Sequence, residues 1–260
     1  MRQLLSCVCS CALFVVFLPA ASGQPAQWAT VKGQVVFPAD KGIPKREPLN
    51  VTQDKQHCLA NNAILDESII VNPKNRGVKN VVVFLRPDEK TVDFPANLIH
   101  PDDAKRKSAE VVIDQPCCMF VARVTCVRVG DTIVVKNPAP VQHNFFWTSE
   151  NNGSHNPTLA KMTDWKMPKP LAKEGGPIKY TCSIHPWMAG YVRIFDHPYY
   201  AVTDENGNFE IKNAPVGKFR IVYWHENGLR GGNKGRFGDP IEIKGPVTDL
   251  KTIDYDVSLK

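Results

Sequence analysis

Short runs of β-branched and aromatic residues, each bounded by Pro, Gly, Asn or Asp, recur along most of this 260-residue chain. The 3.6-residue apolar repeat of amphipathic helices is nearly absent beside them. Short, closely spaced strands separated by turn residues are typical of β-sandwiches. We therefore expect an all-β protein with strands at residues 29–37, 78–85, 109–113, 124–129, 132–137, 144–148, 177–181, 190–194, 201–203, 208–212, 217–224, 240–243 and 252–259.

Residues 1–23 have the order of a secretory signal peptide. A basic start at Arg2 is followed by an apolar run over residues 4–20 and by a small-residue cleavage site at 21–23. The apolar run is interrupted by Ser and Pro, and no later apolar stretch reaches ~18 residues, which makes a membrane span a poor interpretation. We expect the cleaved protein to be exported to the periplasm or the extracellular space, and not to be an integral membrane protein.

Removing these residues changes the cysteine count. Eight cysteines minus three in the leader leave five, which is an odd number in a compartment where cysteines form disulfides. The formal net charge of +6 becomes +5 without Arg2, which is too mild and too evenly spread to indicate a nucleic-acid partner. One of these five cysteines is therefore left outside the disulfides and has a separate role. The five are Cys58, Cys117, Cys118, Cys126 and Cys182.

A Cys-x-x-His-x-x-Met motif lies between two predicted strands. Cys182, His185 and Met188 would be aimed at one point by a tight loop, and His143 would arrive from the end of another strand. One thiolate, two imidazoles and a weak axial thioether are the ligands of a blue (type 1) copper site.

The residues next to these ligands have supporting roles in the same interpretation. Asn144 is placed to hydrogen-bond the backbone near Cys182, and Pro186 and Trp187 would stiffen the loop and exclude water.

The segment from about residue 109 to 195 resembles a plastocyanin/amicyanin-type cupredoxin. The resemblance rests on the short Cys-x-x-His-x-x-Met loop with its His-Pro pair and on the upstream His-Asn. It implies a Greek-key sandwich holding one copper ion, with His185 at an exposed edge through which electrons pass. Gln142 stands where many relatives have Pro, and residues 145–147 are unusually bulky. The implied ligands are His143, Cys182, His185 and Met188.

Other chemistries at Cys182 remain as alternatives. A disulfide would leave the nearby His and Met residues unexplained, structural zinc usually takes paired cysteines, and a Cys/His nucleophile pair lacks an evident orienting residue. Beyond the leader the sequence has no His-x-His, His-Cys-His or Cys-x₃-Cys pattern, so a multicopper oxidase is disfavoured. We expect a one-electron carrier and not an enzyme, with a redox protein such as a cytochrome or dehydrogenase as its partner.

The flanking segments resemble the two halves of a carboxypeptidase regulatory-like domain of transthyretin-like fold. The resemblance rests on residues 31–37 and 77–85 before the copper motif, and on residues 201–211 and 215–221 after it. It implies a cupredoxin at 109–195 inserted in a transthyretin-like sandwich made of 28–86 and 197–260, and insertion at an exposed turn is physically tolerated.

If Cys182 binds copper, the other four cysteines allow three connectivities. Adjacent cysteines rarely bond to each other, so we prefer Cys58 with Cys118 and Cys117 with Cys126, with partly free thiols as the alternative.

Several weaker hypotheses remain open. The protein could instead be a copper carrier or sensor, or a surface- or carbohydrate-binding scaffold. The polar stretch 150–176 could cover the metal. A second metal site could use His197, His225 and Glu226, and copper entry could use His155, Met162 and Met167.

Overall fold

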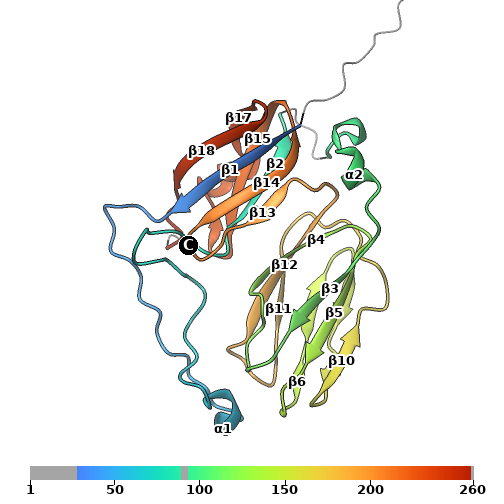
Figure 1. Cartoon of the computed structure of the whole chain (residues 1–260). Helices are drawn as coiled ribbons and strands as arrows, with labels where there is room; N and C mark the ends of the chain where they lie inside the picture. Colours follow the sequence, from blue (N-terminus) through green and yellow to red (C-terminus); the bar gives the residue numbers. More distant parts are fainter. Residues whose placement is uncertain (1–27, 89–92, 259–260) are drawn as a thin grey trace, which may run out of the picture.

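The computed structural model describes residues 28–88 and 93–258, so the expected signal peptide lies outside the described residues. Within these ranges almost all regular structure is β-strand, which confirms the all-β prediction. The strands form two groups of sheets, which we call the outer sandwich and the inserted sandwich (Figure 1).

The outer sandwich is built from both ends of the described chain. One sheet has the order β14-β1-β18, and the other has the order β13-β2-β15-β16 with β17 paired to β15. Its strands are β1 (Trp28–Val36), β2 (Val82–Pro87), β13 (Tyr200–Val202), β14 (Asn208–Pro215), β15 (Gly217–His225), β16 (Gly228–Leu229), β17 (Asp239–Ile243) and β18 (Val247–Asp254).

Strands β2 and β15 are nearly continuous apolar runs because both of their faces are buried. On β2, Val83 and Leu85 point into the core of the outer sandwich, while Val82 and Phe84 belong to a second cluster at the junction with the inserted sandwich. Strand β15 repeats the division, with Tyr223 in the core and Trp224 at the junction.

The inserted sandwich holds the Cys-x-x-His-x-x-Met motif. Its sheets have the orders β10-β5-β3 and β4-β12-β11-β7-β8, and a short β6-β9 pair lies beside them. Its strands are β3 (Glu110–Asp114), β4 (Val124–Arg128), β5 (Thr132–Asn137), β6 (His143–Asn144), β7 (Phe146–Ser149), β8 (Gly153–His155), β9 (Thr158–Leu159), β10 (Thr163–Lys166), β11 (Ile178–Thr181) and β12 (Ala189–Phe195).

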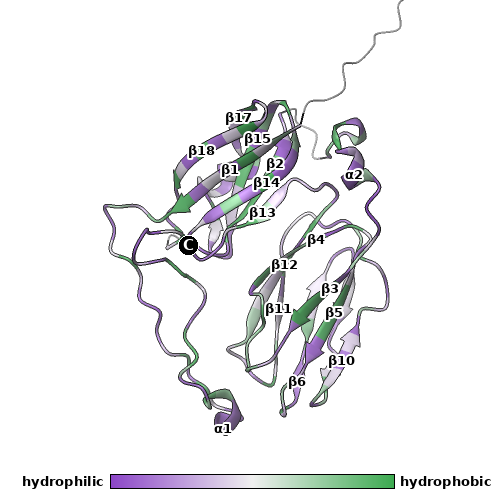
Figure 2. Ribbon diagram, viewed as in Figure 1, coloured by the Kyte–Doolittle hydropathy of each residue, from purple (hydrophilic) through white to green (hydrophobic). Residues whose placement is uncertain are grey.

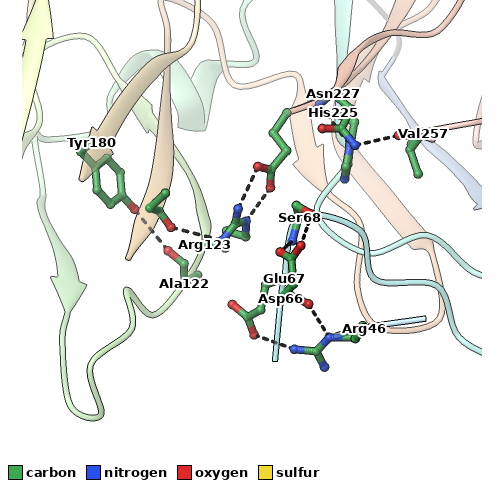
Figure 3. Close-up of polar contacts among 12 residues, drawn as sticks. Arg46, Asp66, Glu67, Ser68, Ala122, Arg123, Tyr180, His225, Asn227 and Val257 are labelled. Carbon is green, nitrogen blue, oxygen red and sulfur yellow. Dashed lines mark hydrogen bonds and ion pairs between the residues drawn. The ribbon is translucent and has the colours of Figure 1, made fainter. Parts of the chain in front are cut away.

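The chain leaves the outer sandwich after β2, builds the inserted sandwich and returns to the outer one at β13 (Figure 1). The described part of the outward connection contains two short helices, η1 (Ala96–Leu98) and α2 (Pro101–Ala104). An ion pair joins the two sandwiches: Arg123 donates to both carboxylate oxygens of Glu226, with Nη2 2.8 Å from Oε2 (Figure 3).

A long excursion between β1 and β2, residues 38–77, runs away from the outer sandwich; we call it the cap segment (Figure 1). Its two arms are held together by Arg46, whose Nε donates to the carbonyl of Asp66 at 2.8 Å and whose guanidinium pairs with Glu67 (Figure 3). At its tip lies the short helix α1 (Lys55–Cys58), which is strongly hydrophilic in Figure 2. The sequence patterns did not predict this excursion.

Several predicted elements differ from the structure; the strand expected at 252–259, for example, is β18 at Val247–Asp254. Strand β2 begins at Val82 instead of residue 78, because Asn80 has a positive φ of 66° that interrupts the extended backbone. The polar stretch 150–176 is not a plain loop: it contributes β8, β9 and β10, and Trp165 of β10 packs against the core of the inserted sandwich.

Candidate metal centre

The Cys-x-x-His-x-x-Met motif forms a closed loop at the end of a β-hairpin. Strands β11 and β12 pair until Thr181 faces Ala189, so residues 182–188 must turn within one tight loop. The backbone N–H of Cys182 donates to the carbonyl of Met188 at 3.3 Å, and the N–H of Met188 donates to that of His185 at 2.9 Å.

Strand β6 brings His143 to the same point. The Nδ1 atoms of His143 and His185 lie 2.9 Å apart, and the Sγ atom of Cys182 lies 4.0 Å and 3.9 Å from them. All three side chains are 0–1% exposed. Met188, from the same loop, is 1% exposed and packs in the same core. The structure therefore brings His143, Cys182 and His185 together and buries Met188 beside them in the motif loop.

The electrostatics favour neutral imidazoles. Burial, together with the neighbouring His185, lowers the pKa of His143 to about 4. Burial also lowers the pKa of His185, against the opposing effect of a hydrogen bond to Asp54. Two neutral rings with their Nδ1 atoms 2.9 Å apart, and a thiol beside them, offer soft and borderline donor atoms to one point, which fits a copper ion.

Asn144 connects the two chain segments that carry these ligands. Its backbone N–H donates to Sγ of Cys182 at 3.4 Å, and its side-chain oxygen accepts from the N–H of Ser183. The N–H directed at the sulfur orients the Cys182 side chain, and the second bond fixes the start of the loop.

Trp187 fixes the other side of the loop. Its Nε1 donates to the carbonyl of Cys118 at 3.1 Å, and its ring lies 5.1 Å from the ring of His185. Pro186, expected to help exclude water, is exposed. Water is excluded from His185 by the cap segment instead.

The cap segment places Asp54 against the metal centre. Its Oδ2 atom lies 2.9 Å from Nε2 of His185, and Asp54 itself is 41% exposed. His185 was expected at an exposed edge, but it is completely buried because the tip of the cap segment covers it. No motif in the sequence pointed to Asp54. One signal could have found it. Asp54 lies four residues before Cys58, and the preferred pairing of Cys58 with Cys118 ties this part of the chain to the segment that carries the candidate ligands.

A disulfide fastens this cap. Cys58 at the end of α1 and Cys118 are joined, with Cα atoms 5.4 Å apart. The second preferred pair is wrong, because Cys117 and Cys126 are both free. Cys126 packs at the junction of the sandwiches, where burial raises the pKa of its thiol to about 12, whereas Cys117 is exposed.

The other metal hypotheses find no support. Within residues 28–88 and 93–258, the candidate ligand groups are His143–Cys182–His185 and a second set whose Cys58 and Cys118 are already bonded to each other. Neither set contains His197, His225 or Glu226.

The residues proposed for copper entry differ widely in exposure. Met162 is 70% exposed, Met167 is buried, and His155 packs against Trp147 and Trp165.

Most of the bulky aromatic residues near the candidate ligands are buried or half-buried. Phe145 and Trp147 are buried in the core, Trp187 is half-buried, and Phe146 is exposed. The cluster therefore contributes mainly to packing.

No family model matches this chain, and no curated protein matches its sequence. Several solved structures resemble part of it. A purple cupredoxin from Nitrosopumilus maritimus is 24% identical over 32% of this chain and 98% of its own, with a TM-score of 0.28. A reduced amicyanin mutant is 25% identical over 33% of this chain and 81% of its own, with a TM-score of 0.29. A copper-containing nitrite reductase from Thermus scotoductus SA-01 is 21% identical over 33% of this chain and 22% of its own, with a TM-score of 0.30.

None of the helices in the described ranges is long and apolar enough to cross a membrane.

Proposed function

We propose that this protein is an exported type 1 copper protein that carries single electrons between redox partners. The observation that supports it most is the convergence of Nδ1 of His143, Nδ1 of His185 and Sγ of Cys182 within about 4 Å in a fully buried site. The ligands would be these three residues and Met188. Export rests on the leader-like residues 1–23, and the flanking segments remain a proposed transthyretin-like domain.

The chain's own residues hold the donor atoms in place. Bound copper would supply a one-electron couple that needs little ligand rearrangement. The N–H of Asn144 keeps the Cys182 sulfur oriented, and the two backbone bonds within residues 182–188 hold the loop closed. A rigid, dry site of this kind lowers the reorganisation that accompanies a change of charge.

The cap changes where a partner could make contact. A partner cannot touch the His185 ring, because that side chain is fully buried. Asp54 accepts the hydrogen bond from Nε2 of His185 and is itself 41% exposed. We infer that the partner, a cytochrome or dehydrogenase-like redox protein, docks at the tip of the cap segment and couples to His185 through Asp54.

A copper carrier or sensor would use the same ligands but would need to exchange its metal. The disulfide-fastened cap over buried ligands is better suited to retaining copper than to releasing it. A purely adhesive scaffold would not require the buried donor cluster.

The test is reconstitution of the purified chain with Cu(II), followed by repeated reduction and reoxidation in the presence of a chelator. An electron carrier would bind one copper per chain and retain it through the cycles. Loss of copper to the chelator in each cycle would favour the carrier or sensor function. Failure to bind copper at all would reject both.

A further inference from the structure

A large cavity lies at the junction of the two sandwiches, away from the metal centre. Its volume is about 1210 Å³, and it is lined by strands β2 and β15 of the outer sandwich and by the end of β12 and residues 173–177 of the inserted one. Cavities between structural units are a frequent location of small-molecule sites.

One wall of this cavity is apolar and aromatic. Phe84, Phe195, Val222 and Trp224 line it and belong to the junction cluster, and Leu229 packs against them. The Phe84 and Phe195 rings lie 5.2 Å apart. A ligand placed here would bury apolar surface against rigid rings, which costs little side-chain entropy.

Beside this wall lie arginines without counter-ions. Arg86, Arg193 and Arg236 all line the cavity, and none of them forms an ion pair within the described part of the chain. Arg86 donates to the carbonyl of Arg236, which brings two of them together.

Arg193 is the most confined of the three. Its guanidinium lies 5.2 Å from the ring centre of Phe84 and 5.6 Å from that of Phe195, and Nη1 donates to the carbonyl of Gly175 at 3.2 Å. Its Nε is buried without a hydrogen-bond partner. Burial, with repulsion from Arg86, lowers the pKa of Arg193. A confined cation with an unsatisfied donor is an energetic cost that an anion would relieve.

Most of the carboxylates that line the cavity are already engaged. Asp196 pairs with Lys173, Asp256 pairs with Lys41, and Glu174 accepts from Ser149 and two asparagines. In the described ranges the Asp254 carboxylate forms neither an ion pair nor a hydrogen bond, and the Asp254 backbone carbonyl accepts from Arg230. The arginines therefore remain available to an external anion.

We propose that this junction cavity binds an amphipathic organic anion, with its carboxylate or sulfonate on Arg193 and Arg86 and its aromatic or apolar part on Phe84, Phe195 and Trp224. The proposal is independent of the copper site. Guanidinium groups pair well with planar anions, and the adjacent rings explain why a simple inorganic ion would not satisfy the site.

The experiment uses anilinonaphthalene sulfonate as an anionic aromatic probe and phenylnaphthylamine as its uncharged counterpart. Titrated into the full chain, the sulfonate should bind at one site per chain, about tenfold or more tightly than the neutral probe. An Arg193→Met variant should weaken sulfonate binding by about tenfold or more and leave neutral-probe binding nearly unchanged. Lys212→Met removes the same charge at an exposed position on β14, and should change neither affinity.

The same measurements can overturn the proposal. Equal affinity for the two probes, or sulfonate binding that survives both Arg193→Met and Arg86→Met, would show that the cavity does not recognise an anion. Circular dichroism establishes whether each variant is folded. If Arg193→Met does not fold, Arg86→Met takes its place, and the comparison of the two probes on the unaltered chain decides the question without any variant.

Discussion

The carboxylate of Asp54 lies 2.9 Å from Nε2 of His185, although the two residues are 131 positions apart in the chain. Asp54 belongs to the cap segment of the outer sandwich, and His185 belongs to the metal centre of the inserted one. A carboxylate on the distal nitrogen of a metal-binding histidine orients the ring and makes it a stronger electron donor. In this structure one sandwich thus contributes a residue to the candidate metal site of the other.

Replacing Asp54 should change the redox properties of the copper protein. The Asp54→Ala variant loses both the hydrogen bond and a negative charge that stabilises Cu(II). The Cu(II) form should therefore be destabilised relative to Cu(I) by about 1 kcal/mol, which raises the reduction potential by roughly 40 mV. Voltammetry measures this shift. Asp54→Asn should give a smaller rise, and Asp40→Ala, at an exposed position in the same segment, should give none. A potential unchanged in Asp54→Ala would contradict the role assigned to this residue.

Met188 should affect the reduction potential of the bound copper and should not be required for copper binding. A Met188→Leu variant keeps the buried volume but removes the weak axial thioether, which should favour Cu(I) and raise the potential while the protein still binds copper. Met162→Leu is the matched control, because Met162 is 70% exposed. Equal potentials for the two variants would show that Met188 is not a ligand.

The Cys58–Cys118 disulfide should stabilise the whole chain and hold the cap. It closes a loop of 60 residues. The double variant Cys58→Ala/Cys118→Ala should lose about 4 kcal/mol of unfolding free energy on loop-entropy grounds, measured by urea denaturation of the metal-free protein. Because the cap is no longer fastened, the copper-loaded double variant should also let small copper-binding anions such as azide reach the metal. Cys117→Ala removes an exposed free thiol and should have neither effect.

Asp131 should make stability depend on pH. It is buried and binds Arg106 through two hydrogen bonds of 2.8 and 2.9 Å, and it also accepts from the N–H groups of Ala109 and Arg128. Burial alone would raise the pKa of Asp131, but these bonds lower it below its ordinary value. The contribution of ionised Asp131 to the unfolding free energy is therefore complete above the unfolded-state pKa of about 4. It is lost as the pH falls through the lower pKa of the folded state.

Asp131→Asn should consequently lower the unfolding free energy by about 2 kcal/mol at neutral pH, and the difference should shrink in acid. Urea denaturation of the metal-free chain at several pH values measures it. Asp164→Asn, at an exposed position on β10, serves as the control. A difference that stays constant down to the lowest pH would be inconsistent with an ionised, paired Asp131.

Local patterns were sufficient to predict the strand-rich fold and the loop that groups Cys182, His185 and Met188, because each depends on neighbouring residues. The meeting of that loop with His143 was predicted from the chemistry of the ligand set. The cap was not predictable in this way, because Asp54 reaches His185 through a long excursion with no periodic signal. Cys126 was assigned a partner by counting, whereas its actual environment is set by the packing of two sandwiches that sequence spacing does not reveal.

The visible absorption spectrum of the Cu(II)-loaded protein shows whether Cys182 binds copper. We expect an intense blue thiolate-to-copper band that disappears on reduction, returns on reoxidation and is absent from a folded Cys182→Ser variant. A copper-loaded protein without that band, or a band that persists in Cys182→Ser, would contradict the assignment of Cys182 as a copper ligand.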